Sequence, residues 1–112
     1  MEEFIELSED RGLYKKTLKE GLEYLEDNNK NIKVSYKIIL EDGTLIEEKC
    51  NTLFDPEDDN KLLGLRIGIK NMKKGEKAIF VMRFDYGLGE ILKNREKNYS
   101  SVIACVDLID FS

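Results

Sequence analysis

One stretch of alternating side chains limits the possible folds of this chain more than any other feature. Between positions 32 and 38 every second residue is apolar, and these residues are Ile32, Val34, Tyr36 and Ile38. Successive side chains of a strand point to opposite faces, so this pattern predicts a strand with one buried face and one face in water. Asp42 and Gly43 then suit a tight turn, and a return strand begins at Leu45. The stretch therefore predicts a β-hairpin.

One helix is predicted after this hairpin. Its apolar side chains are spaced three, four and three residues apart and are Leu62, Leu65, Ile69 and Met72. This spacing lines them along one helix face. With Asn60 as the N-cap and Gly75 as the C-cap, the helix has about three turns. The lysines of "KNMKK" (70–74) then stand at the C-terminal end of the helix, where lysines favourably oppose the partial negative charge of the last carbonyl groups.

Three further strands are predicted, in 13–21, 76–84 and 100–112, with loops over 22–31, 50–60 and 85–99. Strands and helices do not alternate along the chain, which argues against a parallel sheet. The sequence therefore predicts an α+β fold, in which one helix packs on a face of an antiparallel sheet.

Length and composition predict a single domain, residues 1–112, because a chain of this size has little material for a second core. Hydrophobic residues make up 41% and charged residues 37%, which excludes an intrinsically disordered chain. We find no apolar run of about 18 residues and no secretory signal pattern, so we expect a cytoplasmic protein without a membrane partner.

Charge and residue usage exclude several functions. The formal charge of −5, from 18 basic and 23 acidic residues, should repel a phosphate backbone, so we expect no nucleic acid partner. Because the chain has no histidine, Ser-His-Asp and Cys-His catalysis and histidine-based zinc sites are excluded. Asp55, Glu57 and Asp59 have the spacing of a calcium loop, but Asn60 and Arg66 replace its glycine and its final glutamate. We therefore predict a solvated acidic loop there, and neither a metal nor a cofactor.

The cysteines and glycines favour structural interpretations. Cys50 and Cys105 form no CxxC pair and are expected to be reduced thiols in the core, although the sequence alone does not exclude a disulfide. Gly64 and Gly68 form a GxxxG, and Gly87 and Gly89 a GxG. Neither motif is a phosphate loop or a dinucleotide fingerprint, so turn or packing roles are predicted.

Four blocks of the sequence resemble, in order, the FKBP-type peptidyl-prolyl isomerase domain. They are "SEDRGLYKKTLKEG", "VSYKIILEDGTLIEE", "GLRIGIKNMKKGEKAIFVMRFDYGLGE" and "VIACVDLIDF". The resemblance covers nearly the whole chain and implies an FKBP-like antiparallel half-barrel sheet of about five strands wrapped around one short α-helix. It is strongest to the degenerate FKBP domains of tetratricopeptide co-chaperones, including the Shutdown-like subgroup.

The resemblance also implies a pocket that binds proline. Catalytic members hold the proline in an apolar hollow and twist its peptide bond by desolvation and hydrogen bonding, without a nucleophile or metal. The positions matched to this pocket are Tyr36, Ile46, Glu47, Phe54, Leu62, Leu65, Tyr86 and Ala104.

The roles at these positions follow from the match. Tyr36 and Glu47 take wall positions, and Tyr86 takes that of the tyrosine whose hydroxyl holds a ligand carbonyl. Leu62 matches the isoleucine whose backbone amide binds the ligand. At Ile46 the family has phenylalanine, and the segment from 47 to 62 is about four residues shorter than in active members. Whether Phe54 reaches the pocket is left open by that shortening.

Two positions depart most from the catalytic pattern. Leu65 replaces the floor tryptophan, and Ala104 replaces a phenylalanine in the last strand. Each lost ring removes about 1–2 kcal/mol of contact with a proline. The two losses together weaken the binding of a proline by more than about tenfold. We therefore expect weak or no isomerase activity.

Three functions are open at this stage. The first is a protein-interaction module of a co-chaperone, which binds protein clients or proline-containing peptides and docks a heat-shock chaperone through a following tetratricopeptide region. The second is an active isomerase that has rebuilt its pocket around Leu65, Tyr36 and Tyr86. The third is a solitary protein that holds an unrelated ligand in the same hollow.

Overall fold

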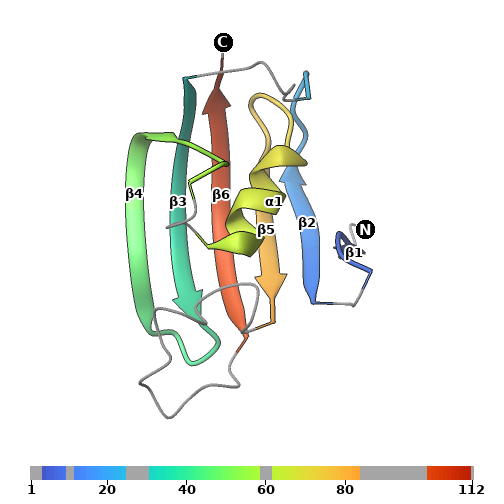
Figure 1. Cartoon of the computed structure of the whole chain (residues 1–112), viewed down its shortest axis with the longest axis vertical. Coiled ribbons are helices and arrows are strands. Elements are labelled where there is room, and N and C mark those ends of the chain that lie inside the picture. Colours follow the sequence, from blue (N-terminus) through green and yellow to red (C-terminus); the bar gives the residue numbers. More distant parts are fainter. Residues whose placement is uncertain (1–3, 10–11, 25–30, 59–61, 84–100, 112) are drawn as a thin grey trace.

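The computed structural model describes residues 4–9, 12–24, 31–58, 62–83 and 101–111, and within them one helix lies on one face of a six-stranded antiparallel sheet (Figure 1). In sheet order the strands are β1 (Ile5–Glu6), β2 (Leu13–Lys19), β5 (Lys77–Met82), β6 (Val102–Asp110), β3 (Ile32–Leu40) and β4 (Leu45–Phe54). The helix is α1 (Leu63–Lys70). The α+β prediction is confirmed, and the sheet exceeds the expected five strands by the two-residue β1.

The predicted hairpin joins β3 to β4. Along β3 every second side chain is buried, from Ile32 to Leu40, as the alternation predicts. The turn is closed by the Leu40 amide, which donates to the Thr44 carbonyl at 2.9 Å. Gly43 has φ +91°, a conformation that glycine adopts without steric cost.

Strand β4 is longer than predicted, so the prediction of a loop over 50–60 is wrong for residues 50–54. Phe54 pairs with Ile32 and is buried, which continues the ladder up to the residue before Asp55. Two register shifts interrupt the pairing of β3 and β4, and Asn51 has a φ of 49° at one of them. Such bulges break the simple alternation from which a strand is predicted.

The helix is shorter than predicted. It ends at Lys70, and Asn71 rather than Gly75 is its C-cap. The Asn71 amide donates to the Gly68 carbonyl at 3.0 Å, and the Met72 amide donates to the Ile69 carbonyl at 3.1 Å. Gly75 lies in the following turn at φ +85°, where its amide donates to the Leu108 carbonyl at 2.8 Å. Lys70 stands in the last turn of the helix, as predicted, whereas Lys73 and Lys74 occupy the following turn, so the prediction that lysines oppose the helix carbonyls is wrong for these two residues. The N-cap is Leu62, so the prediction of Asn60 as the N-cap is wrong; Asn60 itself lies outside the described residues.

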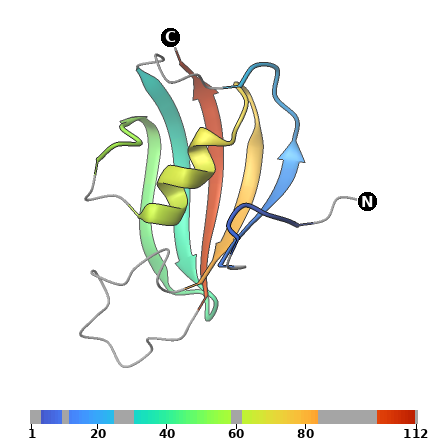
Figure 2. The same ribbon diagram turned by 45° about the vertical axis from the view of Figure 1, so that its right-hand side comes forward.

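Figure 2 shows α1 lying against one face of the sheet. The buried cluster that forms the core includes residues from both the helix and the strands. Leu65 and Ile69 face the sheet and are at most 1% exposed. A Cβ at Gly68 would lie 2.7 Å from a ring atom of Phe80, so a larger residue there would collide with this buried ring. Gly68 is thus a packing glycine, which confirms the prediction for that position.

A buried ion pair joins β2 to the turn after α1. Lys15 Nζ lies 2.8 Å from Glu76 Oε2, and the two side chains are 8% and 2% exposed. The same Lys15 ammonium donates to the Asn71 carbonyl at 2.7 Å. Glu76 also accepts from the Thr17 hydroxyl at 3.1 Å and from the Lys73 amide at 2.8 Å. Both charges are therefore desolvated, and each is held by more than one hydrogen bond or ionic contact.

Both cysteines are free and exposed, so the prediction that they lie in the core is wrong. Cys50 is on β4 and Cys105 is on β6, where its side chain points away from the buried face. None of the helices in the described residues is long and apolar enough to cross a membrane.

We predict that Glu76→Ala lowers the free energy of unfolding by about 3–5 kcal/mol, because it leaves the Lys15 charge buried and unpaired. The double variant Lys15→Met/Glu76→Leu should lose less, since it leaves no buried charge. Urea unfolding measures both values. As a control, Glu57→Ala removes the exposed Lys70–Glu57 pair and should change stability little. A Glu76→Ala effect no larger than that of Glu57→Ala would contradict the proposed importance of the buried pair.

Candidate functional site

Three of the predicted pocket residues meet on the buried side of β3 and β4. The Tyr36 hydroxyl donates to Glu47 Oε1 at 2.5 Å. The rings of Tyr36 and Phe54 pack edge to face, with centroids 6.2 Å apart and an interplanar angle of 83°. Strand β4 supplies Glu47 and Phe54, so the pairing of β3 with β4 creates this contact. Phe54 therefore reaches the Tyr36 ring.

The predicted floor residues belong to the same buried cluster. Leu65 from α1 and Ala104 from β6 are 1% and 0% exposed, and Leu62, directly before α1, is 6% exposed. Ile46 is half-buried and packs against this cluster. The structure thus brings Tyr36, Phe54, Leu62, Leu65 and Ala104 into one core, with Ile46 beside it and Glu47 attached through Tyr36. Tyr86 lies outside the described residues, and the ligand-binding roles of all eight residues stay predictions.

Phe80 is a member of this cluster that sequence reasoning did not assign to the site. It is fully buried, pairs with Ala104 across β5 and β6, and its ring contacts Gly68 of α1. In the folded structure the large ring of Phe80 lies next to two small residues, Ala104 and Gly68. The sequence cannot reveal this arrangement before the strand register and the helix position are known.

Burial governs the chemistry of Tyr36. Desolvation raises the pKa of its phenol well above the ordinary value of about 10, and the hydrogen bond to Glu47 and the charge of Glu47 raise it further. The phenol therefore stays neutral and acts as a hydrogen-bond donor throughout the physiological pH range.

The acidic segment after β4 has structural partners in its described part. Asp55 Oδ1 accepts from the Glu57 amide at 2.9 Å, which forms a local turn. The hydrogen bond from Lys70 lowers the pKa of the Glu57 carboxyl, and Arg66 Nε donates to the Pro56 carbonyl at 2.7 Å. In the described residues no cluster of three or more Cys, Asp or Glu side chains could hold a metal ion. Asp59, which completes the predicted calcium spacing, lies outside them.

We predict that wild-type stability falls as pH rises above about 10 and that this loss is smaller in Tyr36→Phe. The unfolded phenol ionises near pH 10 whereas the folded phenol resists ionisation, so the stabilisation is complete below pH 10 and is lost above it. Urea unfolding of both proteins between pH 8 and about 11 measures the difference. Parallel pH profiles of the two proteins would show that Tyr36 is not the group responsible.

Comparison with known proteins agrees with this geometry. The family model of the FKBP-type peptidyl-prolyl cis-trans isomerase matches residues 25–105. The chain is similar to the crystal structure of the three FKBP domains of wheat FKBP73, with a TM-score of 0.82 and 29% identity, over 97% of this chain and 48% of the wheat chain. It therefore spans about half of that wheat chain.

Two further structures share the fold. The N-terminal domain of FKBP42 from Arabidopsis thaliana has a TM-score of 0.75 and 20% identity, over 98% of this chain and 92% of that one. FkpA from Escherichia coli has a TM-score of 0.72 and 25% identity, over 94% and 50% of the two chains. Since the family model matches most of the chain and the fold agrees, this protein belongs to the FKBP-type peptidyl-prolyl cis-trans isomerase family.

Proposed function

We propose that this FKBP-type domain acts mainly as a protein-interaction module of a co-chaperone and has weak or no isomerase activity. The observation that carries the proposal is the aliphatic floor. Leu65 and Ala104 stand where the resemblance expects aromatic rings, and both are buried. An aliphatic floor offers no ring face to a proline, at a cost of about 1–2 kcal/mol for each ring.

The position of Phe80 supports the same proposal. Its ring lies beside Ala104 and against Gly68, so the core next to the floor is already filled. A close-packed interior cannot accept another ring without rearrangement, which typically costs about 1–3 kcal/mol. The missing pocket ring is therefore not a vacancy that a substrate could simply fill.

An active isomerase is the alternative, and one observation favours it. The Tyr36–Glu47 hydrogen bond and the contact between Tyr36 and Phe54 form a polar and aromatic wall. Such a wall can orient a peptide carbonyl and enclose a proline without any nucleophile.

We also propose the partners of this interaction module. They are protein clients or proline-containing peptides, with a heat-shock chaperone docked through a tetratricopeptide region of a longer protein. A cytoplasmic location is also proposed, and it is supported by the two free thiols, Cys50 and Cys105.

We expect kcat/KM for a proline tetrapeptide to be more than tenfold below that of an active FKBP domain, because two ring contacts are missing. A protease-coupled assay measures it, and titration with tacrolimus tests the pocket in the same experiment. Turnover near that of the active domain, with inhibition by tacrolimus, would overturn the interaction-module proposal.

The triple variant Leu65→Trp/Ala104→Phe/Phe80→Leu should gain at least tenfold in kcat/KM. It restores both pocket rings, and Phe80→Leu makes room for the new ring at 104. The Phe80→Leu single variant is the matched control and should show no gain. A triple variant that folds, judged by urea unfolding, yet shows no gain would locate the defect in the shortened segment between Glu47 and Leu62.

A further inference from the structure

The face of the sheet that points away from α1 carries an apolar strip. Five neighbouring strands contribute one apolar residue each, and these residues are cross-strand partners. The pairs are Tyr14 with Val81, Val81 with Ile103, Ile103 with Ile39, and Ile39 with Leu45. Four of these side chains are half-buried, and Leu45 is 51% exposed. We call these five residues the outer strip. It crosses β2, β5, β6, β3 and β4 without a charged side chain.

Two lysines flank the outer strip. Lys16 is two residues from Tyr14 on β2, and Lys37 is two residues from Ile39 on β3, so both lie on the same face as the strip. Ile79 and Cys105 stand between them in the cross-strand register. Among the described residues neither lysine forms a salt bridge, although Lys16 lies 5.8 Å from the ring centroid of Phe4. Glu48 is the cross-strand neighbour of Lys37. This border of the strip is thus net positive in a chain whose formal charge is −5.

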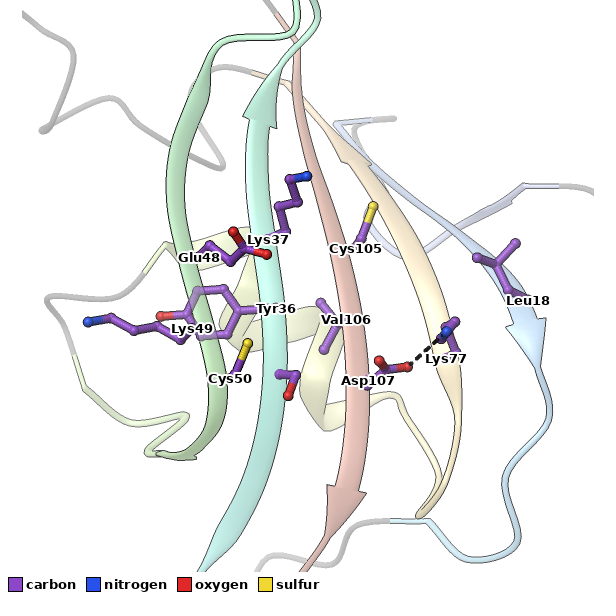
Figure 3. A pocket seen from close by; sticks show the side chains of 11 residues that line it. Leu18, Tyr36, Lys37, Glu48, Lys49, Cys50, Lys77, Cys105, Val106 and Asp107 are labelled. Carbon is purple, nitrogen blue, oxygen red and sulfur yellow. Dashed lines mark ion pairs between the residues drawn. The ribbon is translucent and has the colours of Figure 1, made fainter.

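A hollow of about 390 Å³ adjoins this border (Figure 3). Figure 3 views the sheet from the side opposite α1, and the lining side chains come from neighbouring strands. Lys37 and Cys105 line it, together with Leu18 at the far end of β2. Lys77 and Asp107 pair with each other on its wall, with Nζ and Oδ1 3.8 Å apart. A side chain of a docked partner could therefore enter a recess next to the strip.

The spacing of the strip matches a helix better than a strand. Adjacent strands lie about 4.8 Å apart, so five strands span about 19 Å. An α-helix repeats each turn after about 5.4 Å and covers about 19 Å with 13 residues. An extended segment repeats side chains on one face only every 6.6 Å or so. Apolar side chains one turn apart on a helix can therefore contact successive strands of the strip.

We propose that the outer strip is the docking surface for an acidic amphipathic helix of a partner protein. The apolar face of that helix, about 13 residues long, would lie across the five strands. Carboxylates along one edge of it would face Lys16 and Lys37, because opposite charges steer and orient docking partners. The five residues of the outer strip lie on the opposite face of the sheet from the described residues of the predicted proline pocket, of which Tyr36 also lines the hollow. The strip contains none of the predicted pocket residues, so the proposal holds whether or not the pocket is catalytic.

The experiment uses the whole chain and two labelled peptides of about 14 residues. Both carry leucines one turn apart on one helix face, and one has glutamates along its edge where the other has lysines. Fluorescence anisotropy measures affinity, and backbone amide chemical shifts locate binding. The acidic peptide should bind at least tenfold more tightly than the basic one and should perturb the amides of the outer strip.

Variants test the apolar and charged contacts separately. Ile103→Glu and Leu45→Glu should each weaken the acidic peptide at least tenfold, and Leu45→Glu serves if Ile103→Glu fails to fold. The double variant Lys16→Glu/Lys37→Glu should lose the acidic peptide and gain the basic one. Leu22→Glu, at an 89% exposed leucine beyond the far end of β2, is the matched control and should bind like the wild type.

Several results would overturn the proposal. These are equal affinity for both peptides, acidic-peptide binding unaffected by the strip variants, and no binding of the acidic peptide at millimolar concentration. Sedimentation that shows a concentration-dependent dimer, abolished by Leu45→Glu, would assign the strip to a second copy of the chain instead. None of these variants should alter tacrolimus binding or proline turnover, so failure here is distinguishable from failure of the proposed function.

Discussion

The ion pair between Lys15 and Glu76 is the interaction on which the arrangement of helix and sheet depends. Two desolvated charges are costly unless every hydrogen-bonding group is engaged, so this pair tolerates little displacement. Its bonds reach β2 through Lys15, the end of α1 through the Asn71 carbonyl, and the following turn through the Lys73 amide. The end of the helix is therefore held against the sheet by directional contacts, in addition to the apolar packing of Leu65 and Ile69. Leu65, the predicted pocket floor, belongs to the helix whose C-terminal end this ion pair anchors.

The two faces of the sheet differ in burial. The face toward α1 holds the core, in which Phe80 packs against Gly68 and beside Ala104. Small residues face a large one there, as close packing of the core requires. The opposite face is half-exposed, and its apolar strip is bordered by Lys16 and Lys37. The proposed aliphatic floor and the proposed docking surface therefore concern opposite faces of the same sheet.

The sequence predicted the structure correctly where a regular local residue pattern dominates. It failed where the pairing of strands distant in the chain overrides the local pattern. The alternation in β3 and the turn at Gly43 are local, so the hairpin was predictable. Strand β4 contains two bulges, and its last five residues resembled a loop because their ladder partners lie about 20 residues away in β3. Tyr36 and Glu47, both matched to the pocket by the family resemblance, do meet. Whether Phe54 reaches them was left open by the sequence, and only the structure shows its contact with Tyr36. Lys15 shares the buried parity of Leu13, but its partner Glu76 is 61 positions away and could not be identified from spacing.

The sequence by itself determined the fold class, the single short helix and the aliphatic character of Leu65 and Ala104, because periodicity and side-chain chemistry are local properties. Only the tertiary structure decided which residues share a face. It placed both cysteines at the surface, joined Lys15 to Glu76 and aligned five apolar residues from five strands into one strip. These outcomes depend on strand register, and a shift of a single residue would turn each side chain to the other face.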